Sequence, residues 1–278
     1  MNKLFIIIFF FVILILSVSL IVFRKNKVKK KKYKITSKDK VSVIILNYKR
    51  PHNLKKLVPE LLTYPLIDDI VVSNGLKENE FKFFNKRVKI MNDFKINKLY
   101  GAAIRFLKVK YIKNDIVLFI DDDNIPSEDL VNKLYFTIKN NYDKNTIYGA
   151  KNRTCNSNGY YLTTIKKIIS DAKELLNLNY DHSSYNIILT PILMCKASII
   201  YDYLQSDEGW IKYQEWFKKY KGNCEDLSLN KFIEIYYNEK PVYVNGKYTQ
   251  LDMSNGYSSK IYTHRKIRNN FFKKYSIK

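Results

Sequence analysis

Apolar residues fall into two alternating patterns along this chain. Short unbroken runs of β-branched and aromatic residues, such as Ile116–Ile120, are typical of strands that are covered on both faces. Between the runs, apolar residues recur every three or four positions, as in residues 53–64, and this spacing is typical of amphipathic helices. The alternation predicts an α/β fold in which helices flank a mostly parallel central sheet.

The predicted elements follow one another with short connections. In the first half, strands are expected at residues 41–46, 70–72, 88–91 and 116–120, and helices at residues 53–64 and 100–111. In the second half, helices are expected at residues 130–140, 197–205 and 226–236, and strands at residues 185–190 and 242–244. No linker divides this region, so one domain is predicted over residues 41–278.

Three adjacent aspartates, Asp121, Asp122 and Asp123, directly follow the run at 116–120. Ligands of open α/β sheets collect beyond the carboxyl ends of such strands. Adjacent carboxylates repel one another by roughly a few kcal/mol at low dielectric, so they favour a compensating cation, and hard oxygen ligands suit Mn²⁺ or Mg²⁺. The alternative is an acidic turn, or a helix start that is capped by Ser127.

The N-terminal segment differs from the rest of the chain. Residues 4–23 form a run of twenty residues without a charge, which is long enough to cross the hydrocarbon core of a bilayer as a helix. We interpret this run as a transmembrane anchor that follows a short tail, residues 1–3, and precedes a basic linker, residues 24–40. A cleaved signal peptide is the alternative, but its apolar part is usually shorter.

The basic linker indicates how the anchor is oriented. Eight Lys and Arg residues lie between positions 24 and 34, whereas only Lys3 and the terminal amine precede the anchor. The positive-inside rule therefore predicts a single-pass membrane protein whose downstream domain faces the cytoplasm. These basic residues would also attract anionic lipid headgroups. A solvated, disordered linker is compatible both with the cytoplasmic orientation and with contact to lipid headgroups. A lumenal domain is the alternative, since residues 152–154 form a glycosylation sequon.

The formal net charge of +23 raises the question of nucleic-acid binding. Residues 1–40 contain eleven Lys and Arg and one acid, a net charge of +10, which leaves +13 for the other 238 residues. That remainder is rich in Lys and Asn without an Arg-rich stripe, so no nucleic-acid partner is expected. Its positive potential would instead attract a nucleoside diphosphate.

Several short motifs occur in an order that resembles a known enzyme family. They read VIILNYKR at 43–50, LLTYP at 61–65, FIDDDNI at 119–125, CNSNGYY at 155–161, YNIILT at 185–190, NCEDLSLN at 223–230 and GYS at 256–258, followed by residues 265–272. Together they resemble the exostosin-like family of GT-A glycosyltransferases, glycosyltransferase family 64, over nearly all of residues 41–272. The resemblance implies a GT-A type nucleotide-diphospho-sugar transferase fold and a UDP-sugar donor.

The same resemblance assigns roles to residues near the strand ends. Asp123 matches the aspartate that coordinates Mn²⁺ bridging the UDP diphosphate. Asp121 matches the residue that faces the ribose or the sugar, and Asp122 would orient hydroxyls of the donor sugar. Candidates for contacts with uracil, ribose or diphosphate lie at the ends of the first two strands and before the triplet: Asn47, Arg50, Ser73, Asn74, Asn97 and Arg105. Without the resemblance, Asn47 and Asn74 are equally typical of turns. Arg105 is then nearly as consistent with a position on the surface of its helix.

A second acidic pair, Glu225 and Asp226, starts the helix predicted at 226–236. Acids are favourable at helix N-termini, so capping alone could explain the pair. The resemblance places it beside the scissile bond, with Asp226 nearest the anomeric carbon and the acceptor hydroxyl and with Arg265 near the leaving diphosphate. Asp226 would stabilise an oxocarbenium-like state if the transfer retains configuration, as in the family, or act as general base if it inverts.

The predicted function is that of a membrane-anchored, metal-dependent glycosyltransferase. It would move a sugar, an N-acetylhexosamine by resemblance, from a UDP donor to a glycan or glycoconjugate acceptor. Three alternatives stay open: an inverting family-2-like transferase that uses another nucleotide sugar, a non-catalytic glycan-binding protein on the same fold, and a nucleic-acid-binding protein at a membrane.

The cysteines depart from the pattern of the family. The family joins the cysteine before the acidic pair to a cysteine three residues after the arginine, but that position is Arg268 here. Cys224 therefore has no expected partner, and with Cys155 and Cys195 it is expected to be a reduced thiol. The missing half of the bridge agrees with a cytoplasmic domain.

Overall fold

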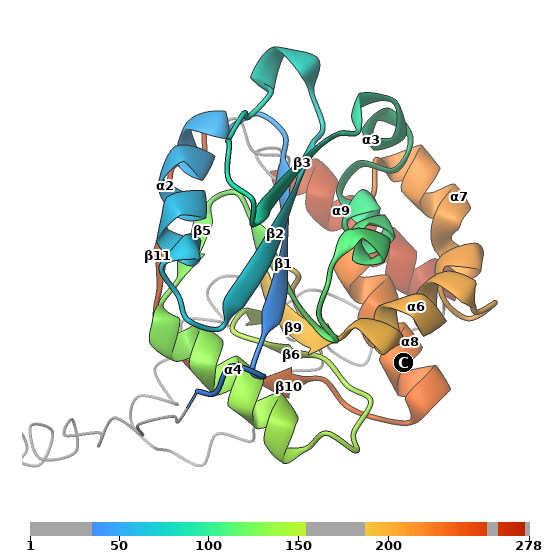
Figure 1. The fold of residues 1–278 in the computed structure, drawn as a ribbon. Helices are drawn as coiled ribbons and strands as arrows, with labels where there is room; N and C mark the ends of the chain where they lie inside the picture. Colours follow the sequence, from blue (N-terminus) through green and yellow to red (C-terminus); the bar gives the residue numbers. More distant parts are fainter. Residues whose placement is uncertain (1–34, 154–186, 255–260, 276–278) are drawn as a thin grey trace, which may run out of the picture. The chain divides into compact units, whose positions relative to one another are not determined.

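The computed structural model describes residues 35–153, 187–254 and 261–275 (Figure 1). The predicted membrane anchor at 4–23 and the basic residues at 24–34 lie outside these ranges, as does Cys155. Within them, no helix combines the length and the apolar character that a membrane crossing requires.

A seven-stranded sheet forms the centre of the described part of the chain (Figure 1). Its order is β10-β6-β9-β4-β1-β2-β3. All neighbouring pairs are parallel except those of β9, which runs antiparallel to both β4 and β6. The bounds are β1 Val41–Asn47, β2 Ile67–Asn74, β3 Val88–Asn92, β4 Ile116–Asp121, β6 Tyr148–Gly149, β9 Ile192–Lys196 and β10 Val242–Tyr243. The prediction of a mostly parallel central sheet is confirmed.

Two short two-stranded sheets lie beside the main one. β5, Asn124–Pro126, pairs antiparallel with β11, Tyr248–Gln250. β7, Asn152–Arg153, pairs antiparallel with β8, Ile187–Ile188. The strand predicted at 185–190 is thus confined, within the described residues, to two positions.

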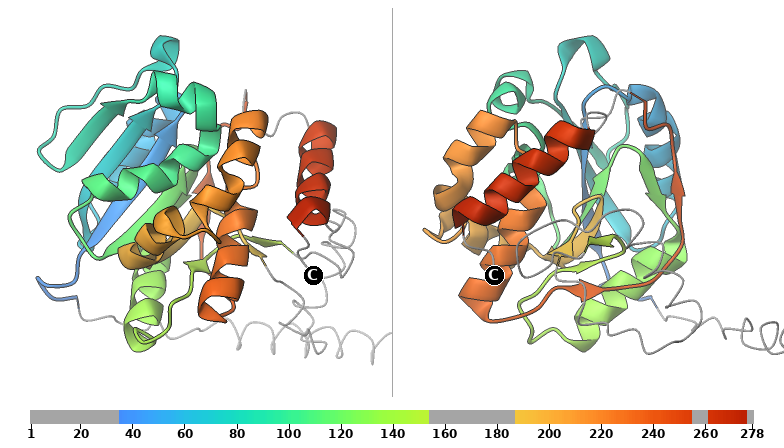
Figure 2. Two further views of the ribbon diagram at one scale, coloured as in Figure 1. Left: turned by 90° about the vertical axis from the view of Figure 1, so that its right-hand side faces the viewer. Right: turned by 180° about the vertical axis from the view of Figure 1, so that it is seen from behind.

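Helices cover both faces of the sheet (Figure 2). The helices α2 and α4 pack on one face, whereas η2, α6, α7 and α8 pack on the other. Helix α9 lies outside α7, where the ring of Phe271 is 5.2 Å from the ring of Trp216. The bounds are α2 Pro51–Leu62, η1 Lys77–Asn79, α3 Phe94–Tyr100, η2 Gly101–Tyr111, α4 Glu128–Asn140, α6 Ala197–Gln205, α7 Trp210–Tyr220, α8 Glu225–Tyr237 and α9 Ile261–Tyr275.

The continuous apolar runs form strands because alternate side chains enter two different cores. In β1, Ile44 packs on the side of α6 to α8, and its neighbours Val43 and Ile45 pack on the side of α2 and α4. All three side chains are buried. Burial on both faces explains why these strands lack the polar alternation of a half-exposed sheet.

The predicted helix at 100–111 is confirmed in position, but it is a 3₁₀ helix rather than an α-helix. An α-helix ends at Tyr100, and residues 101–111 form a 3₁₀ helix. Gly101 has φ of +46°, which favours glycine and breaks the α-helical run. A Cβ at this position would lie 1.8 Å from the carbonyl oxygen of Lys221, so no other residue fits without movement of the backbone.

The strand ends bring polar side chains to one edge of the sheet. In the parallel register, Asn47 at the end of β1 lies opposite Asn74 at the end of β2. Its neighbour in β1, Leu46, lies opposite Asp121 at the end of β4. Parallel strands therefore deliver the predicted donor-side residues and the aspartate triplet to the same edge, as expected from the α/β pattern.

Candidate active site

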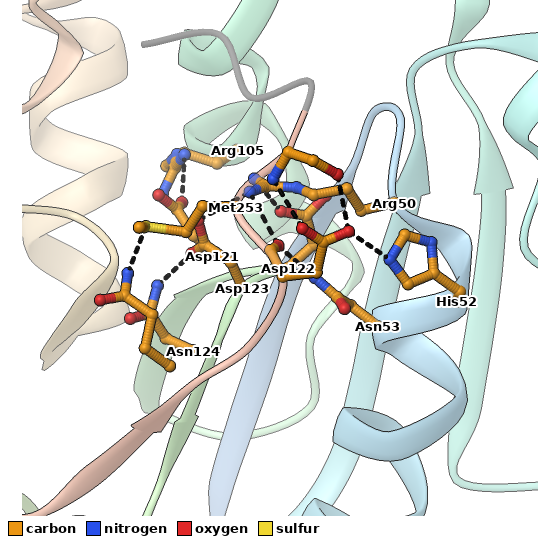
Figure 3. Close-up of polar contacts among 12 residues, drawn as sticks. Arg50, His52, Asn53, Arg105, Asp121, Asp122, Asp123, Asn124 and Met253 are labelled. Atoms are coloured by element: carbon orange, nitrogen blue, oxygen red, sulfur yellow. Dashed lines mark hydrogen bonds and ion pairs between the residues drawn. The ribbon is translucent and has the colours of Figure 1, made fainter. Parts of the chain in front are cut away.

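The aspartate triplet lies at the end of β4 and in the turn that follows it, and it is bound by two arginines (Figure 3). Asp122 and Asp123 form the turn between β4 and β5, so the turn interpretation also holds. Arg105 Nη2 lies 2.8 Å from Asp121 Oδ1. Arg50 bridges the other two carboxylates: its Nη1 donates to Asp123 Oδ2 at 2.8 Å, and its Nη2 pairs with Asp122. Arg50, predicted from its place after β1, therefore lies directly on the triplet.

Burial and the charge of Asp121 raise the pKa values of the other two carboxylates of the triplet. Asp122 is 4% exposed, and burial raises its pKa to about 7 against the opposing effect of Arg50, with Asp121 adding to the rise. Burial also raises the pKa of Asp123, again with the charge of Asp121 adding to it. A further cation near the triplet would stabilise the ionised forms.

The second acidic pair meets the triplet through one shared arginine. Arg105 Nη2, which binds Asp121, is also 3.7 Å from Glu225 Oε1. The same Glu225 oxygen accepts a hydrogen bond from Thr190 Oγ1 at 2.9 Å. Arg105 is 4% exposed, so the helix-surface interpretation of this residue is wrong. Two motifs about a hundred residues apart in the sequence thus share one buried guanidinium.

Asp226, the neighbour of Glu225, points to the last helix. Its Oδ2 is 2.7 Å from Arg268 Nη2, and its Oδ1 accepts a hydrogen bond from the Leu227 amide at 2.8 Å. Cys224 precedes the pair with φ of +75°, a left-handed backbone that starts α8 abruptly. Arg265 also belongs to α9, but its side chain is not among those that the structure describes.

The asparagines predicted on the donor side form a buried amide ladder across the sheet edge. Asn47 Nδ2 donates to Asn74 Oδ1 at 2.7 Å, and Asn74 Nδ2 donates to Asn92 Oδ1 at 3.0 Å. They also bind the loop after β2, because Asn47 Nδ2 donates to the carbonyl of Asn79 and Asn74 exchanges hydrogen bonds with the backbone of Phe81. Asn47 and Asn74 thus lie at the ends of strands rather than in turns, and their side chains hold the loop that follows β2.

Ser73 and Asn97 lie further along the same edge. Ser73 Oγ donates to Asp93 Oδ2 at 2.5 Å, and Lys108 Nζ is 2.6 Å from Asp93 Oδ1. Asn97 Nδ2 donates to the Gly75 carbonyl at 3.2 Å. Among the described residues, none of the hydrogen bonds of Ser73 or Asn97 reaches the aspartate triplet.

Sequence reasoning missed the segment that follows β11. The Asp252 carbonyl accepts from Asn53 Nδ2 at 2.8 Å and from Arg50 Nη1 at 3.3 Å, and its carboxylate is 3.0 Å from His52 Nε2 (Figure 3). The Leu251 amide donates to the Asp123 carbonyl at 2.8 Å. No local signal marks residues 251–252, since they reach the site only through the pairing of β11 with β5.

Asn124 and Lys151 were missed as well. Lys151 Nζ donates to Asn124 Oδ1 at 2.6 Å, and Asn124 Nδ2 pairs with Asp123. Asn124 directly follows the triplet and could have been found from the motif. Ser127, in contrast, has the predicted capping role, because its side chain accepts a hydrogen bond from the Leu130 amide at 3.2 Å.

Comparison with known proteins decides the family. A family model described as the glycosyl transferase family 64 domain matches residues 41–276. The chain belongs to glycosyl transferase family 64. It is a glycosyltransferase, and such an enzyme binds a nucleotide-sugar donor and an acceptor. The predicted resemblance to this family is confirmed.

No curated protein matches the chain. Among solved structures, 4-diphosphocytidyl-2C-methyl-D-erythritol synthase from Anaerococcus prevotii DSM 20548 is similar at 14% identity with a TM-score of 0.44. The match covers 84% of this family 64 chain and 96% of that chain.

The buried Glu225 gives the family 64 domain a testable pH dependence of stability. Burial raises its pKa from 4.5 to about 7, the charge of Asp226 adds to the rise, and Arg105 opposes it. Because the folded state holds the proton more tightly than the unfolded chain, this stabilisation is present below about pH 4.5 and is lost as the pH rises through about 7.

Glu225→Gln removes that ionisation. The variant should therefore gain stability relative to the wild type as the pH rises from about 5 to about 8. The expected gain in the free energy of unfolding is on the order of 1 kcal/mol or more, and it appears as a larger difference between the two melting temperatures at about pH 8. Scanning calorimetry without added metal measures it. Glu234→Gln, an exposed change on the same helix, should show no such trend. A difference that stays constant or shrinks with pH would contradict the buried, proton-binding state of Glu225.

Proposed function

We propose that this family 64 domain transfers a sugar, an N-acetylhexosamine, from a UDP donor to a glycan or glycoconjugate acceptor. The observation that carries the proposal is the meeting of the two acidic motifs at Arg105, which is within 2.8 Å of Asp121 and 3.7 Å of Glu225. Sugar transfer from a nucleoside diphosphate needs groups for the diphosphate and groups for the anomeric carbon within one sugar length. A strand-end triplet beside a helix-start pair meets that requirement.

A divalent cation, Mn²⁺ or Mg²⁺, would be held by Asp123. The raised pKa values of Asp122 and Asp123 support the need for added positive charge. The side chain of Asp121, two residues before Asp123, is 28% exposed, so this carboxylate is accessible to a donor bound beside the cation. When bound, the cation would neutralise the charge that develops on the departing UDP.

The side chains around the triplet would hold the donor. Arg50 reaches two of the three carboxylates and would exchange part of these contacts for the donor diphosphate or uridine. Asp121 would face the ribose or the sugar, and Asp122 would orient sugar hydroxyls. The amide ladder of Asn47 and Asn74 would shape the uracil end, together with Ser73 and Asn97.

Asp226 would lie nearest the anomeric carbon. Its carboxylate is fixed at both oxygens, which supports electrostatic stabilisation of an oxocarbenium-like state. Transfer with retention is what the family resemblance implies. Glu225 would support Arg105 beside the diphosphate, and Arg265 would bind the leaving phosphate oxygens.

The chain would be anchored in a membrane by residues 4–23, with the enzyme domain on the cytoplasmic side. The basic residues after the anchor support this orientation. Two buried cysteines, Cys195 and Cys224, are free thiols, which agrees with a reducing compartment. Protease protection of the domain in sealed membrane vesicles would test the orientation.

A donor screen tests the function. The full chain, purified in detergent with Mn²⁺, is incubated with UDP-N-acetylglucosamine, UDP-N-acetylgalactosamine, UDP-glucose and GDP-mannose, and the free nucleoside diphosphate is measured. We expect release of UDP from an N-acetylhexosamine donor and little release of GDP. Release from none of the donors would remove the proposed reaction, and release of GDP alone would favour the family-2-like alternative.

A further inference from the structure

Arg268 carries a buried charge that the proposed reaction does not yet use. It lies on α9 and is 4% exposed, and its Nη2 is 2.7 Å from Asp226 Oδ2. The side chains of the pair are 5% and 6% exposed. Removing a guanidinium from water is costly unless the partner geometry is good, so a buried arginine at this place needs a reason.

Attachment of the last helix does not supply that reason. Phe271 and Phe272 of α9 are 0% and 3% exposed and belong to the core on that face of the sheet. The ring of Phe271 packs 5.3 Å from that of Tyr213 and 5.2 Å from that of Trp216. These aromatic contacts already fix α9 on α7, and an apolar residue at position 268 would serve the attachment equally well.

The contacts of Asp226 indicate a positional role instead. Oδ1 accepts from the Leu227 amide, Oδ2 accepts from Arg268, and the Asp226 carbonyl accepts from Asn230 Nδ2 at 2.7 Å. Asn230 also exchanges two 2.8 Å hydrogen bonds with the backbone of Ile188. The first turn of α8 is thus held by β8. Among the described residues, the Arg268 contact alone fixes the second carboxylate oxygen.

The neighbouring ionisable groups do not take over this contact. His264 lies one turn before Arg268 on α9, and burial lowers its pKa to about 4 with the charge of Arg268 adding to the effect. It is therefore neutral near pH 7. Arg105 is paired with Asp121 and Glu225.

We propose that Arg268 is a positioning residue that holds the Asp226 carboxylate in place beside the reacting sugar. The inference rests on the proposed function, because it assigns Asp226 to the reacting centre. A positioning role differs from that of a purely stabilising ion pair in one respect. Loss of the guanidinium should lower the turnover of bound donor, and not donor binding or folding stability alone.

The test compares two replacements with a matched control. In Arg268→Met the charge is removed with similar length, and in Arg268→Lys the charge is kept without the fork geometry. The control is Arg87→Met, because Arg87 is part-buried and its side chain, among the described residues, donates only to backbone carbonyls: Leu62 at 3.0 Å, Asp68 at 3.1 Å, and Ile67. For each variant, kcat and donor KM are measured from UDP release, and melting is recorded.

We expect Arg268→Met to lower kcat by about 100-fold with donor KM within about threefold, and Arg268→Lys to recover at least about a tenth of the wild-type kcat. Arg87→Met should lower the melting temperature while the folded enzyme keeps its kcat. A fall in melting temperature without a fall in kcat for Arg268→Met would overturn the inference and leave a purely structural tie.

A double-mutant cycle covers the case in which Arg268→Met folds poorly. Asp226→Asn removes the buried anion, so adding Arg268→Lys to it should cost little further kcat if the two residues act as one unit. If the kcat loss of the double variant equals the product of the two single-variant losses, the residues act independently and the inference is overturned. If the wild type itself releases no UDP, the proposed function is contradicted, and so is this inference. If the wild type is active and Arg268→Met has the same kcat, the inference alone is contradicted.

Discussion

Replacement of Asp123 by asparagine is expected to lower kcat for UDP release by about 1,000-fold or more. The change keeps the size of the side chain but removes the charge that would hold the divalent cation. The change also removes the anion that pairs with Arg50, but the hydrogen bond from the Leu251 amide to the Asp123 backbone carbonyl does not involve the side chain and is kept in the turn between β4 and β5. UDP release at saturating Mn²⁺ and donor measures the effect.

Asp129→Asn is the matched control for Asp123→Asn. Asp129 is an exposed acid in the first turn of α4, and its side chain pairs with Lys133 at 2.9 Å. An exposed i,i+4 pair contributes only about 0.3–0.5 kcal/mol, so this variant should retain nearly full activity. An Asp123→Asn enzyme with more than about a tenth of wild-type kcat would contradict the metal-binding role.

The second large effect is expected for Asp226→Asn. It should lower kcat by about 100-fold to 10,000-fold with little change in donor KM, because a charge near the anomeric carbon acts mainly in the transition state. The same change leaves the Arg268 guanidinium buried beside a neutral amide, so stability should fall by about 3–5 kcal/mol. Steady-state kinetics and urea unfolding separate the two effects.

Glu234→Gln controls for a change of charge on the same helix. Glu234 is exposed near the middle of α8 and pairs with Lys231 at 2.9 Å. It should alter neither kcat nor stability by a measurable amount. If Asp226→Asn were destabilised yet fully active when folded, Asp226 would be a structural residue and not part of the reacting centre.

Local patterns were sufficient to predict the sheet. The apolar runs at 41–46 and 116–120 became β1 and β4, because a strand with both faces covered needs no long-range information to be recognised. Strand-end placement then predicted that Asp121 would lie near the residues after β1. The helix expected at 100–111 formed as a 3₁₀ helix. The break before it was not predicted, because the φ of Gly101 depends on its packing against Lys221, a contact that the sequence does not reveal.

The site residues that belong to sequence motifs were predictable, whereas those contributed by distant segments of the fold were not. The triplet and the pair were found from their motifs, Arg50 from its place after the first strand, and Arg105 from its place before the triplet. Asp252 and Lys151 were not found, because they come from segments far along the chain and face the triplet only in the folded domain. Arg268 was noticed only as an absent cysteine, and its pairing with Asp226 needed the structure.

The central claim is that a cation held beside Asp123 makes the nucleotide leave the sugar. Its most direct test is the rate of UDP release by the wild-type full chain with Mn²⁺, after removal of the metal by EDTA, and after Mn²⁺ is added back in excess. We predict a fall of at least about 100-fold on chelation and full recovery on addition. Turnover that persists unchanged in EDTA would contradict the claim.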